Sequence, residues 1–325
     1  MYNKIIEKIY RKKDKNTIFA KNCCMIVMEN KLIAFIINPI SGSKNKNNIV
    51  NQIKTADWFA KNTVEIYFTK CAGDAFENAK KYVERNFDIV VAVGGDGTIN
   101  EIACALIHTK TALAIIPCGS GNGLARELHI PLKANKALQL LTEAKISDID
   151  VCYFNEHPYF CTAGVGFDAA VSKVFAESGK RGFFSYLISG LNAYIKMKPV
   201  RCKLTIGDET ISAKAFDITF ANAKQFGNNA YISPLADLRD GIIDVVLIRS
   251  FPWFSCPIMG MRLFMKNIHK SKYVKIYKCK HAVLEVSEND CAHYDGESVP
   301  AKTRIEIKIE PLALKVVSHK SGENS

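Results

Sequence analysis

Between residues 31 and 148 the sequence alternates short apolar segments with segments of helical spacing. LIAFII, DIVVAV and ALAIIP are brief, rich in β-branched residues and bounded by turn residues, which indicates buried strands. A strand that is apolar on both faces must be covered on both faces, and parallel strands need a crossover connection, usually a helix. We therefore predict an α/β domain over residues 31–148, a parallel sheet with helices on both faces.

Downstream of residue 149 the pattern changes to short alternating strands separated by hairpin signals. Gly207–Asp208, for example, separates RCKLTI from ETISAKAF. Helical spacing is confined to segments near 183–196 and 253–267. We predict a mainly antiparallel, β-sandwich-like second domain over residues 149–318, whose last strand can return to the first domain.

Both ends of the chain differ from these domains. The first 27 residues carry seven Lys or Arg against two Asp or Glu, and we interpret residues 1–30 as a basic extension without fixed structure. An alternative start at Met28 would make most of it dispensable. Residues 319–325 are read as a frayed tail.

Composition narrows the functional classes. A length of 325 residues with 48% hydrophobic and 23% charged residues indicates a globular protein of two domains. The net charge of +12 suggests an anionic partner, although solubility alone could explain it; without a basic-aromatic motif, we predict no nucleic-acid binding. Eleven cysteines without a CxxC pair fit neither a disulfide framework nor a zinc site, and indicate a cytoplasmic protein. No apolar run reaches the roughly 18–20 residues that span a bilayer.

A glycine-rich turn, GGDG at residues 94–97, follows the strand DIVVAV and precedes a helical segment. The carboxyl ends of parallel strands and the N-termini of helices are the usual phosphate sites of α/β sheets. Asp96 would repel a bare phosphate, so a Mg²⁺ ion between the carboxylate and phosphate oxygens is the natural resolution. The alternative is an Asp-Gly turn that only links strand and helix.

Two further loops of small residues follow neighbouring strands. NPISG at residues 38–42 follows LIAFII, and GSGNG at residues 119–123 follows ALAIIP. Because the strands are predicted to be parallel, all three loops lie at one edge of the sheet. We expect them to converge on one polyphosphate.

These motifs carry a family resemblance. GGDGTINE, NPISG and PCGSGNGLA, followed by SPLADLRDGIIDVVLI (233–248) and HYDGESV (293–299), resemble the diacylglycerol kinase catalytic domain family of bacterial lipid kinases, which includes sphingosine and ceramide kinases. The resemblance covers residues 31–318. NAD kinases share a more distant version of GGDG. The resemblance implies an ATP- and Mg²⁺-dependent kinase that phosphorylates a lipid hydroxyl.

The resemblance also implies site residues. In the family ATP is bound by the first-domain loops, and a structural Mg²⁺ lies in the second domain. The matching ATP-binding positions are Asn38, Pro39, Ser41, Gly42, Thr69, Gly94, Gly95, Asp96, Gly97, Thr98, Asn100 and Ser120. The matching metal ligands are the carboxylate of Asp240 and the backbone carbonyls of Asp237 and Ile242. One departure is Gly123, where the family often has an acid.

Asp295 and Glu297 match the family's Asp-Gly-Glu motif. Phosphoryl transfer to an alcohol needs a carboxylate within hydrogen-bond reach of the hydroxyl, to accept its proton. We expect one of the two to be that base, and the sequence does not choose between them. An isolated Asp-Gly-Glu would more often be a plain hairpin turn, and the accompanying motifs favour the catalytic interpretation.

The acceptor is less constrained. Diacylglycerol, a related lipid, a long-chain base or ceramide all fit the resemblance, and each implies a partner at a membrane surface. SFPWFSCPIMGMRLFMKN (250–267) mixes Trp, Phe and Met with Arg and Lys, as an interfacial helix would, although ordinary core is the alternative. We expect a peripherally membrane-associated protein, with a homodimer possible. The competing functions are an NAD kinase and a lipid-binding regulatory protein without turnover.

Overall fold

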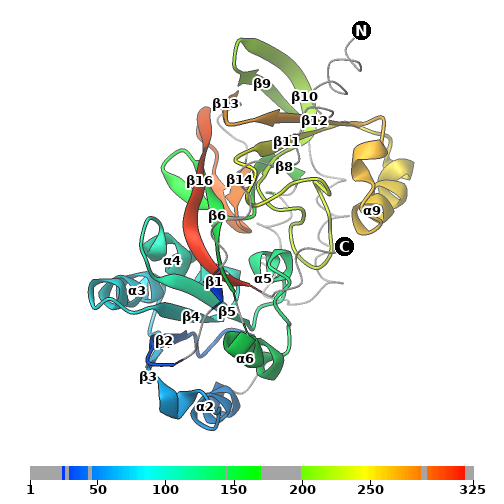
Figure 1. Cartoon of the computed structure of the whole chain (residues 1–325). Helices are drawn as coiled ribbons and strands as arrows, with labels where there is room; N and C mark the ends of the chain where they lie inside the picture. Colours follow the sequence, from blue (N-terminus) through cyan, green and yellow to red (C-terminus); the bar gives the residue numbers. More distant parts are fainter. Residues whose placement is uncertain are drawn as a thin grey trace.

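The computed structural model describes residues 24–25, 29–42, 46–143, 145–167, 169, 199–286 and 291–318. Its first half is a parallel sheet in the order β3-β2-β4-β5, shown in Figure 1. The strands are β2 (Leu32–Ile37), β3 (Thr63–Phe68), β4 (Ile89–Gly94) and β5 (Ala112–Pro117). Every residue of β4 and β5 is buried, as expected for strands covered on both faces.

Helices cover the two faces of this sheet. Figure 1 places one pair of helices, α3 and α4, on one side and the other pair, α2 and α6, on the opposite side, and the members of each pair are in contact. The helical elements are α2 (Lys46–Lys54), η1 (Phe59–Lys61), α3 (Asp74–Glu84), α4 (Asp96–Leu106), α5 (Gly123–Glu127) and α6 (Ala134–Glu143). The predicted α/β architecture is confirmed.

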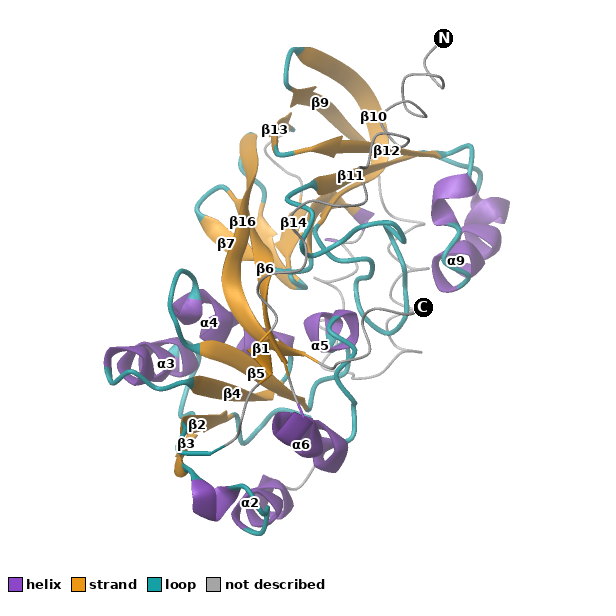
Figure 2. Ribbon diagram, viewed as in Figure 1, coloured by secondary structure: helices purple, strands orange, loops and turns teal. Residues whose placement is uncertain are grey.

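The second half is antiparallel and encloses its own apolar core, which confirms the predicted β-sandwich-like character. Figure 2 shows its strands stacked beyond the first sheet, with one helical insertion at the side. The strands are β6 (Lys145–Phe154), β7 (His157–Tyr159), β8 (Thr162–Gly166), β9 (Val200–Ile206), β10 (Glu209–Ala221), β11 (Ile243–Arg249), β12 (Val274–Cys279), β13 (His281–Glu285), β14 (Cys291–Tyr294) and β15 (Glu297–Pro300). The insertion comprises η2 (Trp253–Ser255), α9 (Cys256–Phe264) and η3 (Ile268–Lys270).

One long strand connects the two halves. β16 (Arg304–Ser318) pairs antiparallel with β13 and β6, and near its end Val316 aligns in parallel with Leu113 of β5. The predicted boundary at 148–149 falls inside β6, so the hydrogen-bonded ladder runs across it. A short strand from the N-terminal region, β1 (Cys24–Met25), also pairs with β6.

Of the two helical segments expected in the second half, the one near 253–267 contains α9. The helix expected near 183–196 lies outside the described residues. Within the part of the chain that the structure describes, no helix is long and apolar enough to cross a membrane.

Candidate active site

The three small-residue loops meet at the carboxyl edge of the parallel sheet. A Cβ atom added to Gly42, whose φ is +62°, would lie 2.0 Å from the carbonyl oxygen of Cys118. A Cβ on Gly119 would lie 2.8 Å from the Cα of Gly95. Backbones this close leave no room for side chains, so glycine is required at these contacts. The loops therefore pack directly on one another, as the sequence predicts.

One hydrogen bond links the first loop to α4 after the second loop, and two more fix the first loop itself. The Asn38 side-chain amide donates to Thr98 Oγ1 at 3.0 Å, and the Ser41 hydroxyl donates to the Asn38 carbonyl at 3.0 Å. The buried Lys46 ammonium donates to the Ser41 carbonyl at 2.6 Å. Lys46 is not among the predicted site residues, and a lysine just after a small-residue loop is the signal that could have identified it.

Asp96 joins the second loop to the third. Its two carboxylate oxygens accept the backbone N–H groups of Asn122, at 2.9 Å, and Gly123, at 2.7 Å. Burial raises the pKa of Asp96, and the two amides act in the opposite direction. The carboxylate among the three loops thus accepts the amides of the neighbouring loop and offsets their partial positive charge. We call these three loops, residues 38–42, 94–97 and 119–123, the cradle. A further role through a magnesium ion stays a prediction.

Asn122 shapes the third loop and is a second residue that the sequence analysis missed. It lies in the left-handed region, with φ of 52°, and its side chain bonds both the N–H and the carbonyl of Gly119, at 3.0 and 2.8 Å. Asparagine tolerates this conformation and closes such local hydrogen bonds. Asn within a run of glycines is the pattern that could have indicated it.

The remaining predicted ATP-binding residues surround this cluster. A Cβ on Gly94 would lie 2.6 Å from the Thr98 side chain, so these two positions are in contact. Thr69 follows β3 at the same edge, and its amide donates to the Ile37 carbonyl at 2.9 Å. Three further predicted residues are exposed at the surface of the loops: Pro39, Gly97 and Ser120.

Asp295 lies beside α4, the helix that begins at the GGDG turn. Its Oδ2 accepts the Asn100 side-chain amide at 3.0 Å, so α4 is bonded directly to the turn between β14 and β15. Its other donors are the backbone N–H groups of Phe160 at 2.9 Å, Cys161 at 2.8 Å and Thr162 at 3.2 Å. A carboxylate has about four acceptor positions, and all four are used. Burial raises the pKa of Asp295, against these hydrogen bonds.

Glu297 occupies a different environment two residues further along. Its side chain is exposed, and it accepts no hydrogen bond from any residue that the structure describes. Both carboxylates lie near Cys104, whose pKa rises to about 12 because of burial first and the neighbouring negative charges second. The two acids of the motif are therefore unequal: Asp295 is saturated with donors, whereas the acceptor positions of Glu297 are open.

The predicted metal ligands lie in the turn that precedes β11. Asp240 Oδ1 accepts the Ile242 amide at 3.0 Å, and the Asp240 amide donates to the Asp237 carbonyl at 3.5 Å. Burial raises the pKa of Asp240, and the nearby Asp237 and Asp244 act in the same direction, whereas the Lys278 ammonium, which pairs with Asp244 at 2.7 Å, lowers it. Carboxylate and carbonyl oxygens are the ligands that Mg²⁺ prefers. The described ranges hold no group of three or more His, Cys, Asp or Glu side chains arranged as metal ligands, so a site here would depend on carbonyl oxygens and water.

Both halves of the chain match known protein families. Residues 32–154 match the diacylglycerol kinase catalytic domain, and residues 161–318 match the YegS C-terminal NAD kinase beta sandwich-like domain. Residues 32–154 therefore belong to the diacylglycerol kinase catalytic domain family. This first match contains all three loops, and the second match contains the predicted metal turn and the Asp-Gly-Glu turn.

Relatives agree with this assignment. The chain is 32% identical over 185 residues to a protein from Enterobacter named probable lipid kinase YegS-like, and 28% identical over 189 residues to a diacylglycerol kinase from Staphylococcus saprophyticus. These matches cover 55% and 56% of this chain, but only 62% and 61% of the relatives. A crystal structure of a diacylglycerol kinase from Bacillus anthracis superposes with a TM-score of 0.71 at 20% identity, covering 90% of this chain and 98% of that one. This likeness supports the fold.

Proposed function

We propose that this family member is an ATP- and Mg²⁺-dependent lipid kinase, which transfers the γ-phosphoryl group of ATP to a hydroxyl of diacylglycerol or a related lipid. The observation that carries the proposal is the hydrogen bond from Asn100 to Asp295, at 3.0 Å. It joins α4, the helix that follows the GGDG turn, to the turn that carries the candidate base. This bond supports the proposal, because the proposed phosphate site and the proposed proton acceptor are then neighbours.

ATP binds in this proposal at the cluster of three loops. Backbone amides and the N-terminus of α4 receive the phosphates, because these groups carry the partial positive charge that phosphate needs. Asn38, Asp96 and Asn122 hold the loops in register through the hydrogen bonds described above. Their contribution is positioning, which supplies much of the catalysis in phosphoryl transfer.

Glu297 is the proposed proton acceptor. A general base needs a free lone pair directed at the substrate hydroxyl, and the four donors on Asp295 occupy its acceptor positions. Glu297 is exposed, on the other side of Gly296 in the same turn. Asp295 is then a positioning residue, which fixes the turn relative to the segment 160–162 and to α4.

Mg²⁺ is the implied metal. The Asp240 carboxylate with the carbonyls of Asp237 and Ile242 would hold a structural ion, and a second ion would accompany the ATP phosphates. When bound, Mg²⁺ neutralises phosphate charge during transfer.

The acceptor is a lipid, so the enzyme works at a membrane surface as a peripheral cytoplasmic protein. The candidate acceptors are diacylglycerol, monoacylglycerol, sphingosine and ceramide. The net charge of +12 suits an anionic bilayer, to which each nearby Lys or Arg contributes about 1 kcal/mol.

The test is phosphate transfer from labelled ATP with Mg²⁺ in mixed micelles. The four lipids are offered separately, with NAD in solution as a counter-test, and Glu297→Gln is compared with wild type. Label on one lipid, strongly reduced in Glu297→Gln, supports the kinase and identifies its acceptor class. Label on NAD reassigns the chain to nucleotide phosphorylation. ATP binding without transfer to any acceptor favours a regulatory protein.

A further inference from the structure

The insertion between β11 and β12 exposes an unusual number of large apolar side chains. Trp253 is 77% exposed, Phe254 64%, Met265 59%, Met261 54% and Ile258 52%. Single exposed apolar residues are ordinary, but a contiguous patch of this kind marks a surface that contacts something apolar. We call these five residues the α9 patch. Figure 1 shows α9 at the side of the second domain, remote from the parallel sheet.

The patch is a second apolar face on a helix that is already anchored. Met259 of α9 is buried in a small core with Val246, Ile268 and Val274, and Leu263 packs against that core. Met259 and Leu263 are four residues apart and share one face of the helix. Ile258, Met261 and Met265 follow the same periodicity on the other face. The internal core thus holds α9 in place while it presents its apolar face outward.

Positive charge surrounds the patch without any acidic residue in the same stretch. Residues 245–284 contain eight Lys or Arg and no Asp or Glu. Within them, Lys266, Lys270 and Lys272 follow α9 and are exposed, and Arg262 lies in the last turn of α9 itself. An apolar patch rimmed by lysine and arginine, with an aromatic pair at its tip, is the composition of interfacial membrane anchors.

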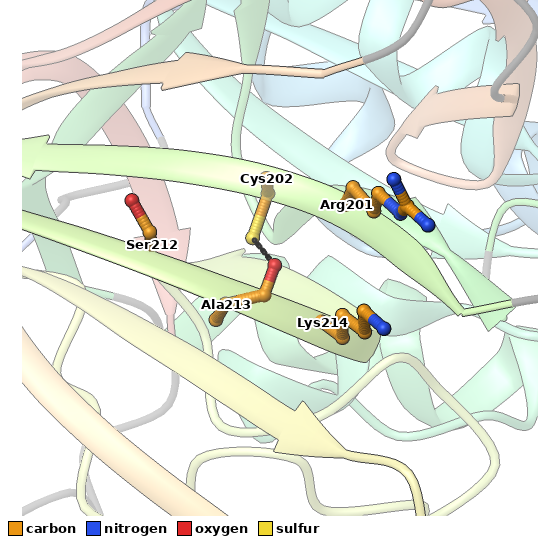
Figure 3. A pocket seen from close by; sticks show the side chains of 5 residues that line it. All are labelled: Arg201, Cys202, Ser212, Ala213 and Lys214. Carbon is orange, nitrogen blue, oxygen red and sulfur yellow. Dashed lines mark hydrogen bonds between the residues drawn. The ribbon is translucent and has the colours of Figure 1, made fainter.

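The adjoining end of the sheet continues this positive surface. Arg201 of β9 and Lys214 of β10 are cross-strand partners, so their side chains share one face of the sheet. Arg249 of β11 pairs with Ala215, the next residue of β10, and therefore lies on the opposite face. Figure 3 shows Arg201 and Lys214 side by side at the edge of a surface hollow of 460 Å³. Like charges directly opposite each other destabilise a sheet, and no described carboxylate pairs with either one. An external anion would relieve this repulsion.

We propose that the α9 patch, together with this basic sheet end, is the surface through which the protein docks on an anionic lipid bilayer. The aromatic and methionine side chains enter the interface, while Arg201, Lys214 and the lysines after α9 contact the headgroups. A second copy of the chain is disfavoured as the occupant, because a two-fold interface would place this uniformly positive surface against itself. The proposal deepens the proposed function, since it says how a lipid acceptor is reached.

The experiment is co-sedimentation with vesicles of phosphatidylcholine, with and without phosphatidylglycerol. We expect binding to the anionic vesicles that falls as salt is raised. The chain has two tryptophans, and Trp58 is only 5% exposed, so a blue shift of fluorescence on binding reports Trp253. Quenching by brominated acyl chains then tests whether Trp253 enters the bilayer.

Two pairs of variants test the two parts of the surface. Trp253→Ser with Phe254→Ser should lower the partition coefficient at least tenfold, whereas the control Leu312→Ser, at an exposed leucine on β16, should not. Arg201→Glu with Lys214→Glu should lower it by more than the roughly fivefold expected for a single charge. Lys80→Glu with Lys81→Glu, on the exposed side of α3, is the matched control.

Three outcomes would overturn the proposal: no binding of wild type to anionic vesicles, equal binding by the α9 patch variant and wild type, or a dimer in solution that the same variant dissociates. Binding does not depend on turnover, so the two proposals fail separately. If vesicle binding follows these expectations but no lipid is phosphorylated, the docking surface stands and the kinase proposal falls. Reduced activity on vesicles but not on micelles in Trp253→Ser with Phe254→Ser would connect the two.

Discussion

Replacing Asp295 with asparagine separates structural from catalytic roles in the Asp-Gly-Glu turn. The carboxylate accepts four donors, three of them backbone N–H groups. Asparagine keeps one acceptor oxygen and directs an amide group at the remaining donors, so at least two donors lose their partner. A buried donor without an acceptor costs about 1–3 kcal/mol, which predicts a loss of about 2–6 kcal/mol in the free energy of unfolding. The Glu297 side chain is exposed, so Glu297→Gln should change the free energy of unfolding by less than about 0.5 kcal/mol.

Thermal unfolding and the micelle kinase assay are measured on the same preparations. At about 2 °C per kcal/mol for a chain of this size, Asp295→Asn should lower Tm by roughly 4–12 °C. Asp208→Asn, in the exposed turn between β9 and β10, is the matched control and should melt like wild type. Glu297→Gln should melt like wild type and lose most of its kcat. An Asp295→Asn variant with unchanged Tm and abolished kcat, beside an active Glu297→Gln, would refute the reasoning and make Asp295 the base.

Three further predictions concern the cradle and the buried acids. Gly42→Ala should raise the KM for ATP more than tenfold, because the added Cβ would lie 2.0 Å from the Cys118 carbonyl; Gly73→Ala has a comparable positive φ but no neighbour within 4 Å, and serves as a control for backbone strain. Asp96→Ala should weaken ATP binding in titration calorimetry by releasing the third loop, and Asp96→Asn should weaken it less, since one amide oxygen remains. Burial raises the pKa of Asp150 above its ordinary value of 3.8, so the folded state binds more protons than the unfolded state just above that pH. Urea unfolding should therefore show stability falling as pH rises through that window, and Asp150→Asn should flatten this dependence.

The sequence predicted the convergence of the three loops, because parallel strands present their carboxyl ends at one edge. What it could not predict are contacts between distant segments. The partners of Asp295 include the backbone at 160–162, more than a hundred residues away, and nothing local indicates that pairing. The partner of Asp96 is likewise a loop whose shape depends on the left-handed conformation of Asn122. For this reason the sequence could not predict that Asp295 is saturated with hydrogen-bond donors while Glu297 is not.

β16 also has a mechanical consequence. This strand of fifteen residues pairs with β6 along most of its length, and its far end reaches β5. The two domains, called lobes below, therefore share one ladder of hydrogen bonds. Neither lobe can swing away from the other about a flexible joint without breaking that ladder. Opening and closing around substrates must then come from the loops, and heat should melt both lobes in one cooperative transition rather than in two.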